Sequence, residues 1–163
     1  IASILGLTLV GERASNLFLY GKTGTGKTLS AKYIGDRIAE KAKHAGGKNL
    51  KFLYVNCKSK KVSDTEYRIV AELINQYGGK VPATGLPTQD VYTRFIDMID
   101  SEKQIVILVL DEIDQAVKKI SDGFIYTLTR INSELKNAQV SLIGISNRLT
   151  FMDDLDPRVR SSL

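Results

Sequence analysis

Residues Gly21 to Thr28 read Gly-Lys-Thr-Gly-Thr-Gly-Lys-Thr, between an apolar run that ends at Tyr20 and a second run typical of a helix. A glycine-rich loop between a strand and a helix is the context in which phosphate-binding P-loops occur. The glycines let successive backbone N–H groups point inward around phosphate oxygens, and the positive end of the helix points to the same place. An ordinary glycine turn is the alternative. The eight-residue spacing and its flanks favour a nucleoside triphosphate site.

The last two residues of the loop have separate expected roles. The Lys27 ammonium would reach the β- and γ-phosphate oxygens, and the Thr28 hydroxyl can coordinate Mg²⁺. The expected cofactors are therefore ATP or ADP together with Mg²⁺. The residues expected to contact the nucleotide are Gly21, Lys22, Thr23, Gly24, Thr25, Gly26, Lys27, Thr28 and Leu29.

A second motif supplies carboxylates. Residues 105–110 are six consecutive apolar residues, typical of a central parallel strand, and Asp111-Glu112-Ile113-Asp114 follows at once. Ligands of open α/β sheets bind at the carboxyl ends of the strands. We expect Asp111 to hold the Mg²⁺ shell and Glu112 to deprotonate an attacking water. Acidic residues at the start of a helix are the alternative reading. The Asp-Glu pair favours hydrolysis over phosphoryl transfer to a metabolite.

Two later residues complete the predicted site. A third apolar run, residues 139–146, ends at Asn147, whose amide could lie beside the γ-phosphate and position water. Asn is also a common turn residue, which is the alternative. Near the end of the chain, Arg158 could act as an arginine finger on the ATP of a neighbouring subunit, with Arg160 as substitute. A solvated basic surface explains these arginines equally well.

Length and composition fit one domain over residues 1–163. The chain is 43% apolar and 25% charged, carries a net charge of +5, and has no apolar run near the roughly 18 residues that a membrane span needs. One cysteine, Cys57, excludes an internal disulfide and fits a reducing cytosol, where it is expected to be a buried apolar residue. Because no Met starts the chain, we expect a fragment of a longer cytoplasmic protein. The basic balance is compatible with nucleic acid but does not demonstrate it.

Strand-like and helix-like segments alternate along the chain. Strands are predicted at about 16–20, 51–56, 105–111 and 139–146, and helices at about 28–43, 63–76, from 88 onward, and 124–135. The capping box Ser63-Asp-Thr-Glu66 would begin the second helix. This alternation predicts an α/β fold with a parallel sheet covered on both faces. Two helices, rather than one, lie between the second and third strands.

The motifs together resemble those of an AAA+ ATPase, and finer strings narrow the resemblance. Four strings are similar to those of the archaeal origin-recognition and cell-division-control replication initiators: Tyr54-Val-Asn-Cys57, Thr84-Gly-Leu-Pro-Thr88, Tyr126-Thr-Leu-Thr-Arg-Ile-Asn132, and Leu142-Ile-Gly-Ile-Ser-Asn147 before Asp156-Pro-Arg-Val159. The resemblance spans nearly the whole chain. It implies the three-layer α/β sandwich of the P-loop NTPases, truncated here before the fifth strand, the helical lid and the winged-helix domain.

The resemblance also implies a function. Such a protein would bind origin DNA under ATP control, help to load the replicative helicase, and associate with neighbouring copies of itself on DNA in the nucleoid. In that family a helical insert between the second and third strands touches DNA, and the candidates here are Lys58, Lys60, Lys61, Arg68 and Lys80. The family roles carry onto Lys27, Thr28, Asp111, Glu112 and Asn147 as stated above.

One departure and one alternative follow. Many AAA+ proteins carry the finger arginine where this chain has Ser161 and Ser162, which leaves Arg158 as the candidate. The alternative function is an NTPase that assembles or remodels protein partners without specific DNA binding. The extra helix, the basic balance and the Thr84–Tyr92 segment favour the DNA replication initiator.

Overall fold

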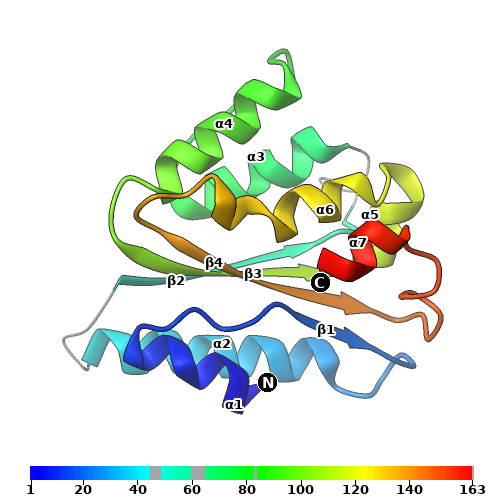
Figure 1. Cartoon of the computed structure of the whole chain (residues 1–163), viewed down its shortest axis with the longest axis horizontal. Helices are drawn as coiled ribbons and strands as arrows, with labels where there is room; N and C mark the ends of the chain where they lie inside the picture. Colours follow the sequence, from blue (N-terminus) through cyan, green and yellow to red (C-terminus); the bar gives the residue numbers. More distant parts are fainter. Residues whose placement is uncertain (45–48, 60–64, 83, 163) are drawn as a thin grey trace.

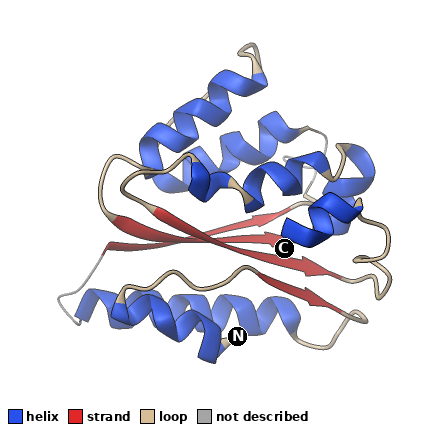
Figure 2. Ribbon diagram, in the orientation of Figure 1, coloured by secondary structure: helices blue, strands red, loops and turns tan. Residues whose placement is uncertain are grey.

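The computed structural model describes residues 1–44, 49–59, 65–82 and 84–162. Its helices and strands form three layers, with a central sheet between two layers of helices (Figures 1 and 2). The elements in chain order are α1 Ala2–Leu5, the 3₁₀ helix η1 Gly6–Val10, β1 Leu17–Tyr20, α2 Lys27–His44, β2 Asn49–Asn56, α3 Glu66–Tyr77, α4 Thr88–Ile99, β3 Gln104–Asp111, α5 Ile113–Lys119, α6 Gly123–Thr129, the 3₁₀ helix η2 Ile131–Ser133, β4 Gln139–Ser146 and α7 Pro157–Ser162. The predicted α/β sandwich is confirmed.

The four described strands are parallel and lie in the order β1-β4-β3-β2. Helices α1 and α2 cover one face of the sheet, and α3 to α7 lie on the other side (Figure 1). The register aligns the carboxyl ends of the strands: Asp111 pairs with Asn56 and with Ile145, and Tyr20 pairs with Ser146. The loops that follow all four strands therefore begin at the same edge of the sheet.

Strand β3 is the centre of the core, and all eight of its residues are buried. Successive side chains of a strand point to opposite faces. Val106, Leu108 and Leu110 accordingly pack in the cluster on the α3–α7 side, whereas Ile107 and Val109 pack in the cluster on the α2 side. A run that is apolar at every position is thus explained by two covered faces.

The helix boundaries differ from the predictions at two places. Helix α3 begins at Glu66 with Thr65 as its N-cap, whose hydroxyl accepts the N–H of Arg68; the predicted cap Ser63 lies outside the described residues. The predicted helix over 124–135 is also wrong in extent, because α6 ends at Thr129 and a separate 3₁₀ turn follows. The Asn132 side chain, which bonds both backbone groups of Val140, holds that turn against β4.

The two helices between β2 and β3 are present as predicted and pack on each other. Helix α3 leads from the carboxyl edge of the sheet to the opposite edge. At its end the Tyr77 hydroxyl accepts a hydrogen bond from Gln104, the first residue of β3. The buried face of α3 includes Ile69, Val70, Leu73 and Ile74. These two helices, with their connections from Cys57 to Lys103, are called the insert below.

Candidate nucleotide-binding site

The predicted P-loop lies between β1 and α2, at the carboxyl edge of the sheet. Gly24 and Gly26 have φ angles of 84° and 83°, a left-handed conformation that costs other residues free energy. The Lys27 ammonium bends back over the loop and donates to the carbonyl oxygens of Gly21, at 2.9 Å, and Lys22, at 2.8 Å. The loop thus has the backbone turn and the cation that a phosphate group requires, and Leu29 lies beyond it with a largely exposed side chain.

The Thr28 hydroxyl donates to Asp111 Oδ2 across 2.8 Å, which joins two motifs 83 positions apart in the chain. The Asp111 side chain is 2% exposed and its Oδ1 accepts the backbone N–H of Glu112 at 2.9 Å. A hydroxyl and a carboxylate are hard oxygen ligands, which suit Mg²⁺ when phosphate oxygens and water supply the other positions. Among the described residues no group of three or more acidic, His or Cys side chains gathers, and the Thr28 hydroxyl and the Asp111 carboxylate are a pair that could share a metal with a bound phosphate.

Glu112 follows Asp111 and caps helix α5 in a left-handed conformation, with φ of 52°. Such a conformation is uncommon outside glycine. Its carboxylate lies 3.6 Å from the ammonium of Lys58, and the Glu112 side chain is 20% exposed. The predicted water-activating group is thus at the site edge, paired with a cation from the start of the insert.

Asn147 lies where the sequence predicts it, directly after β4 and next to the strand that leads into the P-loop. A buried network that the sequence argument did not assign supports this tip. The Ser146 hydroxyl donates to Asp114 Oδ1 at 3.0 Å and accepts the N–H of Arg148. Gln115 donates to the other oxygen of Asp114. Asp114 thus connects the start of α5 to the segment that carries Asn147.

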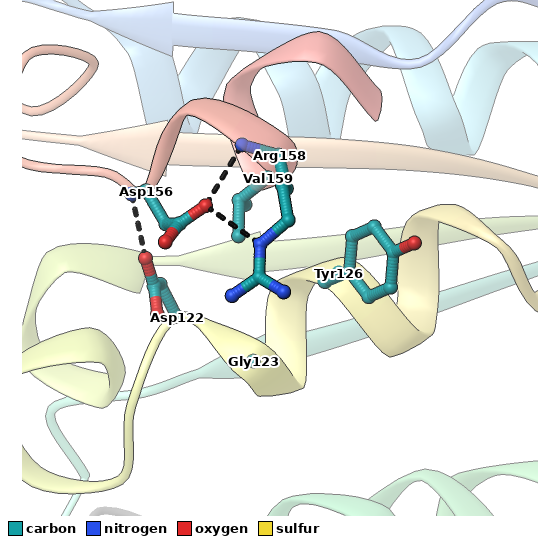
Figure 3. Close-up of a pocket in the computed structure, with 6 residues that line it drawn as sticks. All are labelled: Asp122, Gly123, Tyr126, Asp156, Arg158 and Val159. Carbon is teal, nitrogen blue, oxygen red and sulfur yellow. Dashed lines mark hydrogen bonds and ion pairs between the residues drawn. The ribbon is translucent and has the colours of Figure 1, made fainter.

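Arg158 lies apart from the P-loop cluster, at a small hollow between α6 and α7 that is lined by Asp122, Gly123, Tyr126, Asp156, Arg158 and Val159 (Figure 3). Its backbone N–H and Nε both donate to Asp156 Oδ1, at 2.8 and 3.2 Å. These bonds lower the pKa of Asp156 and raise that of Arg158. The Arg158 side chain is 86% exposed, which leaves it open to a neighbouring molecule.

The three candidate DNA contacts that the structure describes, Lys58, Arg68 and Lys80, do not gather in one place. Lys58 lies at the carboxyl edge of the sheet, whereas Lys80 follows the end of α3, which reaches the start of β3 at the opposite edge. Arg68 lies in the first turn of α3 and is half-buried. Lys60 and Lys61 lie outside the described residues.

Tyr54 is the site residue that sequence reasoning missed. Its hydroxyl donates to Asp111 Oδ2 at 2.6 Å, and burial together with this bond raises the pKa of Tyr54. The string Tyr54-Val-Asn-Cys57 contains the residue, but no local pattern shows which side chain faces a strand neighbour 57 positions away. Cys57 is fully buried as predicted, and burial raises the pKa of its thiol to about 12.

This fold and its P-loop edge define a P-loop nucleotide-binding domain, and comparison with known proteins narrows the class. The AAA domain family matches residues 10–152. An ORC1-type DNA replication protein of Pyrococcus horikoshii is 47% identical over the whole chain, and one of Pyrococcus furiosus is 48% identical. The chain spans 39% of the length of each of these relatives.

Solved structures agree. The Aeropyrum pernix ORC1 protein in complex with DNA matches with a TM-score of 0.89 and 41% identity, over 99% of this chain and 41% of that one. The Aeropyrum pernix ORC2 protein with ADPNP and ADP matches with a TM-score of 0.79 and 25% identity, over 99% of this chain and 43% of that one. The chain belongs to the AAA domain family, and over its whole length it is similar to the ORC1-type DNA replication proteins.

Proposed function

We propose that this chain is the ATP-binding part of a replication initiator that hydrolyses ATP slowly and binds origin DNA. The observation that carries the proposal is the hydrogen bond between Thr28 and Asp111, because it brings the P-loop and the carboxylate of the third strand to one point. A glycine turn and a helix N-terminus that arose independently would not meet at 2.8 Å. The AAA domain match supports nucleotide chemistry, and the ORC2 neighbour was solved with ADPNP and ADP.

In the proposed reaction the residues of the P-loop bind the nucleotide, with Lys27 leaving the loop carbonyls to contact the β- and γ-phosphates. Thr28 and Asp111 would hold Mg²⁺, which neutralises charge on the phosphates. Glu112 would accept a proton from water as the water oxygen bonds to the γ-phosphorus and the bond to the β-phosphate oxygen breaks, which yields ADP and phosphate. Asn147 would orient that water.

Two features favour a slow, regulated reaction. The Glu112 carboxylate lies 3.6 Å from the Lys58 ammonium, so an attacking water would compete with a cation for this carboxylate. Within the described residues, the exposed Arg158 side chain bonds to Asp156 and to no group of the P-loop of its own chain. This arrangement fits an arginine finger that acts on the nucleotide of a neighbouring copy. We propose that ATP favours assembly on DNA and that hydrolysis ends that state.

The proposal of DNA and protein partners is based on what is known of the similar proteins. The ORC1 neighbour was solved in complex with DNA, and the curated relatives are DNA replication proteins. We infer a cytoplasmic protein associated with the nucleoid, which assists loading of the replicative helicase. No helix among the described residues has both the length and the apolar character of a membrane span.

Footprinting of the full-length protein on its own genomic DNA, with ATP and with ADP at physiological salt, tests this function. Protection at a few discrete sites is expected. Absent or uniform protection would contradict the origin-binding proposal. The nucleotide site would then be expected to control binding to protein partners. The experiment is done at physiological salt because any basic protein binds DNA at low salt.

A further inference from the structure

Tyr54 occupies a position between three elements of the nucleotide site. It lies on β2, and its hydroxyl shares Asp111 Oδ2 with the hydroxyl of Thr28. We propose that Tyr54 is a positioning residue for the metal-binding carboxylate: it fixes the orientation of Asp111 and so sets the affinity of the site for the magnesium–nucleotide complex. This inference rests on the proposed nucleotide function.

Among the described residues, the hydrogen-bond donors around Asp111 leave its carboxylate one acceptor position. A carboxylate offers about four lone-pair sites. Two hydroxyls occupy those of Oδ2, at 2.6 and 2.8 Å, and the Glu112 N–H occupies one of Oδ1 at 2.9 Å. The remaining site is on Oδ1. Asp111 is 2% exposed, and rotation of its carboxylate would break all three hydrogen bonds. The remaining lone pair therefore has a fixed direction.

Tyr54 is itself held from the side of the P-loop helix. The Lys32 ammonium lies 3.9 Å from the centroid of the Tyr54 ring, within the range of a cation–π contact. Lys32 is one helical turn beyond Thr28, so both residues project from the same side of α2. The helix that carries the metal-binding hydroxyl therefore also fixes the ring whose hydroxyl contacts Asp111.

The backbone of Tyr54 is held from the insert. Strand β2 is at an edge of the sheet, which leaves one side of its backbone without a neighbouring strand among the described residues. Gln76 of α3 supplies that side: its Oε1 accepts the N–H of Tyr54 at 3.0 Å and its Nε2 donates to the Tyr54 carbonyl at 2.6 Å. The Gln76 amide thus takes the place of a neighbouring strand at this single residue. Through Tyr54 it connects helix α3 to the Asp111 carboxylate.

The arrangement explains why the hydroxyl of Tyr54 matters more than its ring. A phenylalanine would retain the contacts with Lys32 and the strand pairing. It would leave Oδ2 with Thr28 as its remaining donor, and that hydroxyl must also face the metal. Loss of a hydrogen bond to a metal-binding group commonly weakens metal affinity on the order of tenfold or more.

The test compares Tyr54→Phe with the parent in the full-length protein, by titration calorimetry of ADP in EDTA and in Mg²⁺. Manganese titration of the ADP complex, followed by electron paramagnetic resonance, reports metal affinity directly. We expect ADP affinity in EDTA to change less than about twofold and the metal concentration at half-saturation to rise on the order of tenfold. Tyr33→Phe is the matched control, because Tyr33 is an exposed tyrosine on α2, and it should leave both values unchanged.

A second variant keeps the inference falsifiable. Gln76→Ala removes the backbone clamp and retains the hydroxyl, so it should shift the metal dependence in the same direction by less. An unchanged metal dependence in folded Tyr54→Phe protein, or an equal loss in EDTA and Mg²⁺, overturns the positioning role. Failure of the parent protein to bind ADP under either condition would instead overturn the proposed function.

Discussion

The carboxyl edge of the sheet and the hollow between α6 and α7 both contain a charged side chain that the sequence marks as functional, but they are built differently. Asp111 is buried and its hydroxyl donors come from residues 83 and 57 positions away. Arg158 is exposed, and its partner Asp156 is two residues away. Bonds between distant segments fix geometry only when the whole fold is formed. The first region is thus fixed by the tertiary fold, whereas the second is held by bonds between near neighbours and is open to solvent.

The largest expected effect is at the P-loop. Lys27→Ala should weaken ATP and ADP binding on the order of a hundredfold or more, since charge-assisted hydrogen bonds to phosphate contribute about 1.5–3 kcal/mol each. Calorimetric titration measures the change. Lys43→Ala, in the last turn of the same helix, is the control and should bind normally. Undiminished affinity in Lys27→Ala would count against the whole site.

The next effect separates binding from hydrolysis. Glu112→Gln should retain ATP affinity and lower the hydrolysis rate on the order of a hundredfold, the usual contribution of a general base. Thermal unfolding should be nearly unchanged, because exposed ion pairs such as that with Lys58 contribute little to stability. Glu40→Gln, on the exposed side of α2, should hydrolyse ATP at the parent rate. Equal rates for Glu112→Gln and the parent would assign the base elsewhere.

The third prediction concerns Asp100, a carboxylate that accepts several hydrogen bonds but lies away from the nucleotide site. Asp100 accepts the backbone N–H groups of Lys136, Asn137 and Ala138, before β4 and at the opposite edge of the sheet. These bonds, that of Ala138 first, lower the pKa of Asp100. Asp100→Asn should therefore destabilise the fold at neutral pH without changing nucleotide binding.

The pH dependence of that change has a defined sign. A lowered pKa means that the ionised Asp100 contributes stability above its unfolded pKa of about 3.9, and that this contribution is lost as pH falls through the folded value. The difference in unfolding free energy between parent and Asp100→Asn should shrink below about pH 4. Denaturant unfolding at several pH values measures it. A difference that grows on acidification would contradict the assignment.

The smallest effect is expected at the hollow. In dilute protein Arg158→Ala should leave stability and ADP affinity unchanged, because the side chain is exposed and its partner is local. Hydrolysis should fall only at concentrations, or on DNA, where copies associate. Arg160→Ala separates the two candidate fingers. A loss of hydrolysis in dilute Arg158→Ala protein would show that the residue acts within its own chain.

The local sequence predicts most of the fold because its signals are local. A buried parallel strand is apolar at every position, as in residues 105–110, and a P-loop needs glycines at fixed spacing. Helix limits were less predictable: α6 ends at Thr129 because Asn132 bonds to β4, a contact that no helical pattern contains. Thr65 caps α3, and Ser63, the predicted cap, lies outside the described residues.

The sequence by itself determined the parallel α/β class, the P-loop and the order of the acidic motif, since each depends on residues close together in the chain. Tertiary structure alone decided that Tyr54 reaches Asp111, that Lys58 pairs with Glu112, and that Lys58 and Lys80 lie at opposite edges of the sheet. The physical reason is the sheet order. Placing β3 between β4 and β2 brings side chains from distant segments within hydrogen-bonding distance, and short-range spacing does not encode that adjacency.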